Sequence, residues 1–533
     1  MLSDSTLFGS PLSSASFPWE ATMTSIPDFF NGRSVFITGV TGFMGKVLLE
    51  KLLRSCSNIQ KIYVLIRPKR GVEVQARLEK VLDSKLFNSL SESQPDFKSK
   101  VIAMEGDILD ENLGLTDDNV EILKNEVSIV FHSAATVRFD EPLRLAVRMN
   151  VIGLRHMIAV CHELNKLECL VHISTAYANC DREDITETVY EPPMSPEKLI
   201  EATEWMDDEV LDTLTPYLIH PRPNTYTYTK AMAEYLLLKE RGNIPCAIVR
   251  PSIVGPSWSE PMPGWVDNFN GPSGLLAAIG KGILRVMIGD VNARADLIPV
   301  DICVNLIITA AWSTAIDKPS NIPVYNSTTG QSNPLTWGKL EKASYDYYMK
   351  HPLNNPVRIP DPKFTNSRVY KFFHVYLDHY LPAYCLDLIA KISGQKPVLM
   401  RLQSKLWRSV LTLEYFTSHQ WNFSSENTTE LSKHLVQSDR EDFDFDVKKI
   451  DWDVYLENYC VGVKQYALKE DLEGVPKARR QMNRLVQLSR LFKVFVFVLT
   501  WRVLMTRVKV LRDLWQFFLK SILSTGKQIQ AIG

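Results

Sequence analysis

Three glycines spaced three residues apart constrain the fold of this chain more than any other stretch of its sequence. Gly39, Gly42 and Gly45 follow a short run of β-branched and aromatic residues and precede an apolar pattern with helical spacing. In such a strand–turn–helix unit, the first glycine permits a tight turn, the second lets the backbone approach a pyrophosphate, and the third lets helix and strand pack closely. A glycine pattern alone more often marks an ordinary turn. Here the flanking strand and helix indicate a dinucleotide site.

Apolar runs of strand length alternate with helical patterns after this unit. We expect strands at 34–38, 61–66, 101–104, 127–132, 170–175, 245–250 and 324–326. This alternation predicts the α/β class, with a Rossmann-type, doubly wound parallel sheet. Ligands of such sheets bind at the carboxyl ends of the strands, so the residues that follow each strand are candidates for a site.

Cationic residues follow the second strand. An NAD site usually places an acidic residue there to accept from the ribose hydroxyls, whereas this chain has Arg67, Lys69 and Arg70. Guanidinium groups suit a ribose that carries a 2′-phosphate, so the expected cofactor is NADPH. A solvated basic turn is the alternative. After the third strand, Asp107 is either an acceptor for the adenine amino group or a turn residue.

A tyrosine and a lysine four residues apart are the candidate catalytic pair. Tyr226 and Lys230 open a predicted helix, so they share one of its faces. A nearby ammonium favours phenolate, and we expect it to lower the pKa of the tyrosine toward the range useful for proton transfer. A hydroxyl at the end of the fifth strand, from Thr175 or Ser174, is expected to hold a substrate carbonyl oxygen against the phenol.

The same pattern occurs a second time on this helix. Tyr235 and Lys239 repeat it nine residues later, which is about half a revolution around the helix axis, so both pairs cannot face one site. We prefer Tyr226 because it lies at the start of the helix, near the strand ends. Tyr235 is then a packing or surface residue.

Small and polar residues at the other strand ends complete the candidate cofactor site. Small residues after the fourth strand let ribose and nicotinamide lie against backbone. Asn150 is either a buried polar support for the site or a helix cap, and His132 is expected to be a core histidine. The residues expected to contact the cofactor are Thr38, Gly39, Thr41, Gly42, Phe43, Met44, Gly45, Arg67, Arg70, Asp107, Ile108, Ser133, Ala134, Ala135, Asn150, Tyr226, Lys230, Pro251 and Ile253.

Charge and cysteine usage argue against several other classes of function. The net charge of -1 gives no reason to expect nucleic acid as a partner. The eight cysteines show neither C-x-x-C nor Cys/His ligand spacing, so we expect neither a disulfide framework nor a metal site. A nucleophilic Cys/His pair is not apparent either.

The chain of 533 residues is too long for one ordinary core. We expect a disordered leader at 1–26 and a cofactor-binding domain at 27–344. Within this domain, the acidic and Pro-rich stretch 181–224 is expected to be an inserted helical cap over the substrate side. Residues 345–472 are expected to form an α-helical accessory domain that either completes a substrate pocket or is purely structural.

The last segment, 473–533, is basic and apolar. Its longest uncharged apolar run, Val494 to Trp501, is far shorter than the about twenty residues that a bilayer span needs. A helical tail with Trp, Phe and basic residues is typical of the membrane interface, where long cationic side chains reach back to water. We therefore expect an amphipathic or membrane-anchoring tail.

Together these segments resemble a known family. The G-x-x-G-x-x-G spacing is that of short-chain dehydrogenases, and the segments 134–139, 223–230, 250–254 and 263–272 closely resemble the alcohol-forming fatty acyl-CoA reductases, with a resemblance that runs from about residue 26 to the end. It implies an extended short-chain dehydrogenase with a C-terminal male-sterility domain, which reduces long-chain acyl-CoA to fatty alcohol with two NADPH. Carried onto this sequence, it implies Gly39, Gly42, Gly45 and Arg67 for the cofactor, Tyr226 and Lys230 for catalysis, and Thr175 rather than Ser174 for the hydroxyl.

The resemblance also implies a membrane protein whose catalytic domain faces the cytosol, with the peroxisomal membrane favoured and the endoplasmic reticulum as the alternative. Two other functions stay open: a dehydrogenase of a sterol or another hydroxyl or carbonyl substrate, and a catalytically silent, membrane-bound NADPH-binding protein. Intact Tyr226 and Lys230 argue against the silent protein.

Overall fold

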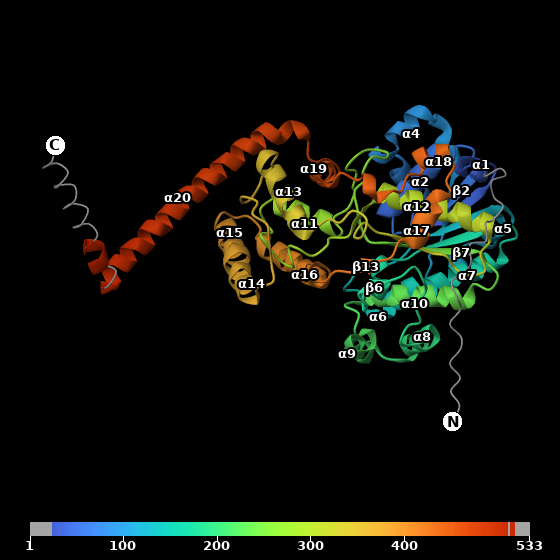
Figure 1. Cartoon of the computed structure of the whole chain (residues 1–533), viewed down its shortest axis with the longest axis horizontal. Helices are drawn as coiled ribbons and strands as arrows, with labels where there is room; N and C mark the ends of the chain where they lie inside the picture. Colours follow the sequence, from blue (N-terminus) through green and yellow to red (C-terminus); the bar gives the residue numbers. More distant parts are fainter. Residues whose placement is uncertain (1–23, 510–511, 518–533) are drawn as a thin grey trace, which may run out of the picture. The chain divides into compact units, whose positions relative to one another are not determined.

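The computed structural model describes residues 24–509 and 512–517 (Figure 1). Two compact units interleave along the chain. Unit 1 holds the described residues up to Asn268 together with Asn292–Trp337 and Thr412–Tyr459, and unit 2 holds Phe269–Val291, Gly338–Leu411 and the described residues from Cys460. The linear boundaries expected at 344 and 472 stay predictions.

Most of the expected leader, residues 1–23, lies outside the described residues. Its end is ordered, because helix α1 (Ile26–Phe30) begins after Ser25, whose hydroxyl accepts from the Asp28 amide. The indole of Trp312 donates to the Thr24 carbonyl at 3.1 Å. The chain therefore joins the core of unit 1 before the first strand.

Seven parallel strands form the main sheet of unit 1, in the order β11-β7-β5-β4-β1-β2-β3. They are β1 (Ser34–Thr38), β2 (Lys61–Ile66), β3 (Val101–Glu105), β4 (Val127–His132), β5 (Cys169–Ile173), β7 (Cys246–Pro251) and β11 (Val324–Ser327). The order changes direction between β1 and β4, where Thr38 lies opposite His132. This is the topological switch point of a doubly wound sheet, so the predicted Rossmann-type fold is confirmed.

Helices cover both faces of this sheet (Figure 1). Helix α12 (Val300–Asp317) packs on β5, β7 and α2 (Phe43–Ser55). On the other face, α7 (Gly153–Glu163) and α10 (Thr225–Glu240) share a core cluster with Val130, Leu170 and Ile248 of the strands. Among the described helices, α12 is the one long and apolar enough to cross a membrane, but 89% of it is buried. Packing on a sheet buried on both faces accounts for its composition.

Further elements complete unit 1. The expected helical insertion is present as α8 (Pro196–Trp205) and α9 (Asp208–Ile219), whose apolar side chains pack on α6 (Leu143–Val147) and α10. The remaining ones are α3 (Val74–Leu82), α4 (Asn88–Ser93), α5 (Asp117–Glu126), β6 (Asp184–Ile185), β8 (Ile253–Gly255), β10 (Leu297–Pro299), β13 (Asn422–Phe423), α17 (Glu426–Lys433), α18 (Gln437–Asp442) and most of α19 (Trp452–Gly462).

A buried carboxylate ties the segment 412–459 to the sheet of unit 1. Glu187 accepts from the main-chain amides of Asn326 (2.8 Å) and Asn427 (2.5 Å) and from the Thr428 hydroxyl (2.7 Å). Burial raises the pKa of Glu187, and these donors oppose that rise. Strand β13 also pairs with β6. Part of the expected accessory domain thus packs as one body with the sheet.

Unit 2 is mainly helical, which confirms the helical C-terminal region. It contains α11 (Pro272–Gly280), α13 (Trp337–Lys350), α14 (Arg368–His374), α15 (Leu381–Ile392), most of α16 (Leu399–Ser418) and α20 (Val475–Arg507), with a short parallel pair of β9 (Val286–Ile288) and β12 (Lys363–Thr365). Only Ala478 and Met482 are buried within α20, whereas Phe492, Phe495 and Phe497 are exposed. Membrane contact by this tail stays a prediction, and residues 510–511 and 518–533 lie outside the described residues.

Candidate functional site

The glycine turn joins β1 to α2 by contacts that leave no room for side chains. Gly39 has φ +79°, and a Cβ there would lie 2.8 Å from the Ala134 amide nitrogen. A Cβ on Gly45 would overlap the carbonyl oxygen of Gly39. The first and third glycines therefore have the expected roles of tight turn and close packing. Gly42 is the N-cap of α2, without a side chain between the helix N-terminus and an approaching phosphate.

Two strand ends are linked at the switch point. The Thr38 hydroxyl lies 3.0 Å from Nδ1 of His132 and accepts from the Ala134 amide at 3.2 Å. Burial, with the charge of Lys230, lowers the pKa of His132 to about 3, so this ring is neutral. The expectation of a core histidine is confirmed. Ser133, Ala134 and Ala135 are partly exposed just beyond it.

The cationic residues lie at the ends of β2 and β3. Arg67, Lys69 and Arg70 are exposed, and Nε of Arg67 lies 3.8 Å from Oδ2 of Asp107. The other oxygen of Asp107 accepts from the Leu109 amide at 3.2 Å, so this residue does shape the turn. Ile108 beside it is buried. A positive rim therefore borders the carboxyl edge of the sheet.

Helix α10 delivers the Tyr-Lys pair. Its N-cap is Asn224, whose side chain accepts from the Thr227 amide at 2.9 Å, so Tyr226 lies in the first turn. The ammonium of Lys230 donates to the Ile173 carbonyl at the end of β5 at 2.8 Å. Burial lowers the pKa of Lys230 to about 8, and the charge of Glu234 opposes this.

The phenol of Tyr226 does not have the lowered pKa expected from the sequence. Burial raises its pKa to about 12, and the hydrogen bond with the Thr175 side chain lowers it only in part. The expectation considered the ammonium and neglected desolvation, which is the larger effect here. The phenol is thus a neutral proton donor near pH 7.

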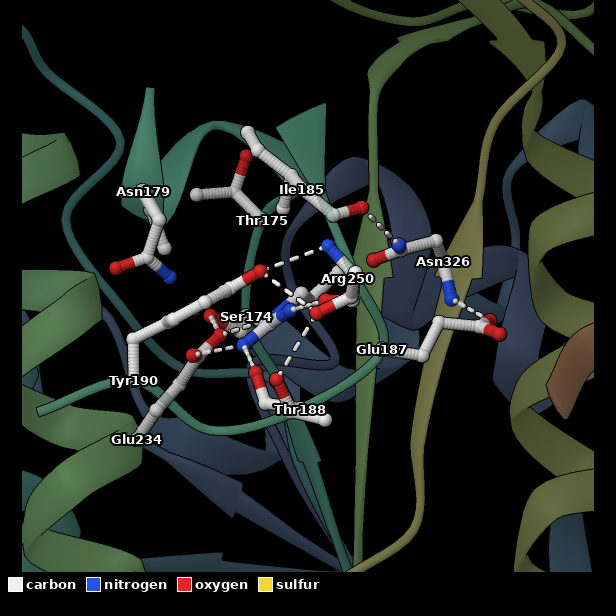
Figure 2. Close-up of polar contacts among 12 residues, drawn as sticks. Ser174, Thr175, Asn179, Ile185, Glu187, Thr188, Tyr190, Glu234, Arg250 and Asn326 are labelled. Carbon is white, nitrogen blue, oxygen red and sulfur yellow. Dashed lines mark hydrogen bonds and ion pairs between the residues drawn. The ribbon is translucent and has the colours of Figure 1, made fainter. Parts of the chain in front are cut away.

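The two hydroxyls after β5 have different partners. Thr175 is a hydrogen-bond partner of Tyr226, and its hydroxyl also donates to the Pro251 carbonyl at 3.3 Å. Ser174 donates to Oε1 of Glu234 at 2.5 Å. Figure 2 shows this serine pointing toward the Glu234 carboxylate.

That carboxylate belongs to a buried ion pair. Arg250 binds both oxygens of Glu234, with Nε at 2.9 Å and Nη2 at 2.7 Å. The same guanidinium donates to the carbonyls of Thr186 (3.0 Å) and Thr188 (2.7 Å) (Figure 2). Since a bidentate pair with further bonds to backbone carbonyls is rigid, it holds β7, α10 and the chain after β6 together.

Asn150 supports α10 from a neighbouring helix. It lies in a π-helical turn (Arg148–Ile152) between α6 and α7, so the expectation that it closes a helix is wrong. Its amide nitrogen donates to the Thr229 hydroxyl at 2.9 Å, and its oxygen accepts from the Thr136 amide at 2.9 Å. The extra residue of the π turn places this side chain inward, and no cap is formed.

The repeated pattern lies elsewhere on α10. The Tyr235 hydroxyl donates to Glu191 at 3.2 Å, and the Lys239 ammonium lies 5.1 Å from the centre of the Tyr235 ring. Neither side chain has a hydrogen bond or ring contact with Tyr226, Thr175 or Lys230. The choice of Tyr226 for the strand-end site agrees with these contacts.

An aromatic cluster borders the phenol of Tyr226, and the sequence analysis did not predict it. The ring of Phe139 lies 5.7 Å from that of Tyr226 and 5.2 Å from that of Phe416. Tyr177 packs edge-on against Phe416 (5.1 Å) and Trp421 (5.2 Å). These residues lie far apart in the sequence and share no spacing, so no local pattern could have joined them.

The remaining candidates for cofactor contact lie along the same edge. Thr41 is exposed and Met44 partly exposed in the turn, and the ring of Phe43 stacks on Trp265 at 5.4 Å. Pro251 ends β7, whereas Ile253 belongs to β8, which pairs with β10 and not with the main sheet. The strand ends thus collect the predicted residues at one edge.

Comparison with known proteins agrees with this arrangement. An NAD-binding family model described as "Male sterility protein" matches residues 37–307, and a second model with the same description matches 378–470. In the solved structures, the terminal reductase domain of the myxalamid biosynthetic pathway has a TM-score of 0.52 at 17% identity, covering 83% of this chain and 93% of that one. The reductase domain of a Mycobacterium tuberculosis nonribosomal peptide synthetase has a TM-score of 0.53, also at 17% identity, covering 83% and 92%. These likenesses show the fold.

Closer relatives identify the family. Fatty acyl-CoA reductase 1 of Xenopus laevis is 46% identical, and that of Homo sapiens is 44% identical. Fatty acyl-CoA reductase 2 of Bos taurus is 42% identical. Each alignment covers 93% of this chain and 96% of the relative. With a matching NAD(P)-binding domain, a matching C-terminal domain and this identity over nearly the whole length, the chain belongs to the fatty acyl-CoA reductase family.

Proposed function

We propose that this protein reduces long-chain fatty acyl-CoA to fatty alcohol in two steps, through the aldehyde, with NADPH as reductant. The observation that carries the proposal is the convergence of Tyr226, Thr175 and Lys230 at the strand ends beside the glycine turn. The substrate class is supported by relatives that are fatty acyl-CoA reductases and that align with this chain over 96% of their length.

The residues at the edge of the sheet fit a dinucleotide phosphate. A Cβ at Gly39 or Gly45 would overlap neighbouring backbone, so glycine keeps this turn tight, and α2 presents its N-terminus there. Exposed Arg67 and Arg70 suit the 2′-phosphate that distinguishes NADPH from NADH. The bound cofactor would supply hydride to the carbonyl carbon of the substrate.

The side chains of Tyr226, Thr175 and Lys230 would carry out the acid catalysis. The Tyr226 and Thr175 hydroxyls would hold the carbonyl oxygen of the thioester while the carbon gains hydride. Collapse of the tetrahedral adduct breaks the C–S bond and leaves the aldehyde, and the expelled CoA thiolate takes a proton from solvent to become the thiol. In the second reduction the phenol donates its proton to the oxygen, which gives the alcohol. The phenolate that remains takes a proton back from solvent, because burial raises the pKa of Tyr226 to about 12.

Ser174 is assigned a positioning role. Its hydroxyl donates to the Glu234 carboxylate, which also binds Arg250. The hydrogen of this hydroxyl is therefore used within the protein and is not offered to a substrate. The neighbouring Thr175 is the hydroxyl that contacts Tyr226. This arrangement favours Thr175 as the residue that contacts the substrate.

The aromatic cluster is proposed to contact the acyl chain near its thioester. Phe139 stacks beside the Tyr226 ring, and Phe416 extends this apolar surface. An alkyl chain against such rings is removed from water, which favours long substrates.

The protein would work at a membrane with its catalytic domain facing the cytosol, on the peroxisome rather than the endoplasmic reticulum.

Product analysis tests the function. With palmitoyl-CoA or stearoyl-CoA, NADPH oxidation should accompany formation of free CoA thiol and hexadecanol or octadecanol. Oxidation only with sterol or other carbonyl substrates would instead support a different dehydrogenase, and absence of oxidation with any substrate would support the silent NADPH-binding protein. Replacing Arg67 and Arg70 by Ala should raise the KM for NADPH and leave that for NADH unchanged.

A further inference from the structure

One helix of unit 2 has its apolar face on the outside. Helix α14, the π turn Val375–Tyr380 and α15 form a continuous helical segment, Arg368–Ile392. We define its outer face as the exposed residues Val369, Phe372, Phe373, Tyr376, Leu377, Leu381, Tyr384, Leu388, Ile389 and Ile392. These recur three to four residues apart along most of the segment, so they form one stripe.

The opposite face is buried, although it includes two polar side chains, those of His379 and Asp387. Val375, His379, Ala383 and Asp387 lie four residues apart, and the exposed fractions are 2% for His379 and 8% for Asp387, compared with 59% for Phe372 on the outer face. A surface helix of a soluble protein normally turns its apolar face toward the core and its polar face toward water. A large exposed apolar stripe of this kind marks a surface that contacts another apolar partner.

Specific hydrogen bonds fix this orientation. His379 accepts from the Arg285 amide at 3.2 Å and lies 2.9 Å from the side-chain nitrogen of Gln403. Asp387 accepts from the amides of residues 398, 399 and 400 at 3.0, 2.9 and 2.8 Å, and so caps α16. Turning the outer face inward would break all of these bonds, so the exposed stripe is built into the fold.

Basic residues outnumber acidic ones along the segment and the α16 helix that follows it. Between residues 368 and 408 the sequence has seven Lys or Arg and two Asp. Both aspartates are used internally, Asp387 as the cap of α16 and Asp378 in ion pairs with Arg285 (3.5 Å) and Arg358 (3.4 Å). Two copies of this face would bring like charges together, whereas an anionic lipid surface would complement them.

We propose that the outer face of Arg368–Ile392 is a membrane-binding surface, which lies in the headgroup region of a bilayer that contains anionic lipid. Aromatic residues with basic residues around them are typical of helices at that depth. This surface lies on a different segment of the chain from the α20 helix, and both belong to unit 2. The proposal does not depend on the reduction chemistry.

A native cysteine provides the test. All eight cysteines lie in the described residues, and Cys385, within this segment, is the one that is exposed. In the full chain, an environment-sensitive fluorophore on Cys385 should shift to the blue and gain intensity when vesicles of phosphatidylcholine with phosphatidylserine are added, and respond less to phosphatidylcholine alone. The control moves the label to unit 1, as Tyr217→Cys in a Cys385→Ser chain, because Tyr217 is 81% exposed. That label should not respond.

A matched pair of variants measures the contribution of the face to binding. Phe372→Glu with Ile389→Glu should lower partition to the anionic vesicles by about tenfold or more, because two large apolar side chains leave the interface. Trp205→Glu with Tyr217→Glu, at exposed positions of the insertion, should leave partition unchanged. Because all four positions are exposed, the unfolding temperature should be unchanged in both variants.

Three results would overturn the proposal. The first is a silent Cys385 probe on chains that nevertheless co-float with the vesicles, since the tail alone would then bind. The second is unchanged partition of the Phe372/Ile389 variant. The third is conversion of an oligomer to a monomer by that variant with vesicle binding intact, which would assign the face to a second copy of the chain.

Discussion

Tyr226 and Tyr235 begin the same four-residue pattern on one helix, yet their hydroxyls meet different surroundings. One is a partner of Thr175 at the end of β5, and the other donates to Glu191 of the insertion. Tyr226→Phe should lower kcat by several orders of magnitude while the Kd for NADPH stays the same, since only the proton donor is lost. Tyr235→Phe should be nearly silent. Equal losses in the two variants would contradict the assignment of the helix face.

The two hydroxyls after β5 should also differ in what they contribute. Thr175→Ala should lower kcat strongly, and because the hydroxyl donates to the Pro251 carbonyl and accepts from the Tyr177 amide, it should also lower the free energy of unfolding by about 1 kcal/mol or more. Ser174→Ala removes a hydrogen bond to a buried carboxylate, so it should lower the free energy of unfolding by about 2 kcal/mol and retain most of the activity. Steady-state kinetics with chemical denaturation separates the two effects. The opposite pattern would make Ser174 the hydroxyl that contacts substrate.

Lys230 predicts opposite effects of pH on activity and on stability. Its pKa is about 8 in the folded chain, compared with 10.5 for an unperturbed lysine. Above pH 8 the ammonium is lost and kcat/KM should fall. Between pH 8 and 10.5 the unfolded chain binds a proton that the folded chain lacks, so this group should make the fold more stable as pH rises. Rates and thermal unfolding at matched pH values test both signs, and Lys239→Ala should leave the rate profile unchanged.

At the scale of elements, the contact between α2 and the glycine turn predicts a steric effect. Gly45→Ala places a methyl group against the backbone of Gly39 and Val40, which cannot move as a flexible side chain can. We expect the free energy of unfolding to fall by about 3 kcal/mol and NADPH binding to be lost. Gly32→Ala is the control, because that glycine has φ +72° and an added Cβ would have no atom of the described residues within 4 Å. It should cost only the strain of about 1 kcal/mol and leave binding intact.

Local elements were the part of the fold that could be predicted. Each strand of the main sheet is a short apolar run, and Tyr226 and Lys230 share one helix, so nearby residues carry the signal. The π turn at Asn150 was missed because its helical pattern continues through α6 and α7. The raised pKa of Tyr226 and the contact of Phe139 with Phe416 depend on tertiary packing, which no local spacing encodes.

For the whole molecule, the buried residues of α20 predict where the chain can be shortened. Ala478 and Met482 are the buried residues of this helix. A chain that ends at Asn483 should keep its unfolding free energy within about 0.5 kcal/mol and its activity toward acyl-CoA in solution. Its partition to anionic vesicles should fall but persist through the outer face of Arg368–Ile392. A chain that ends at Gly474 loses both buried residues and should be measurably less stable, as denaturant titration would show.

The bonds of Glu187 have a consequence for how this protein is made in the cell. The Asn427 amide that it binds lies 240 residues later, and 103 residues beyond Val324 of the last sheet strand. A ribosome that has finished all seven strands has therefore supplied the Asn326 amide but not yet the donors of Asn427 and Thr428. The bonds of this carboxylate can be completed only after the region around Asn427 has emerged. An allele with an early stop codon after the sheet should consequently yield a degraded product and no partly active enzyme.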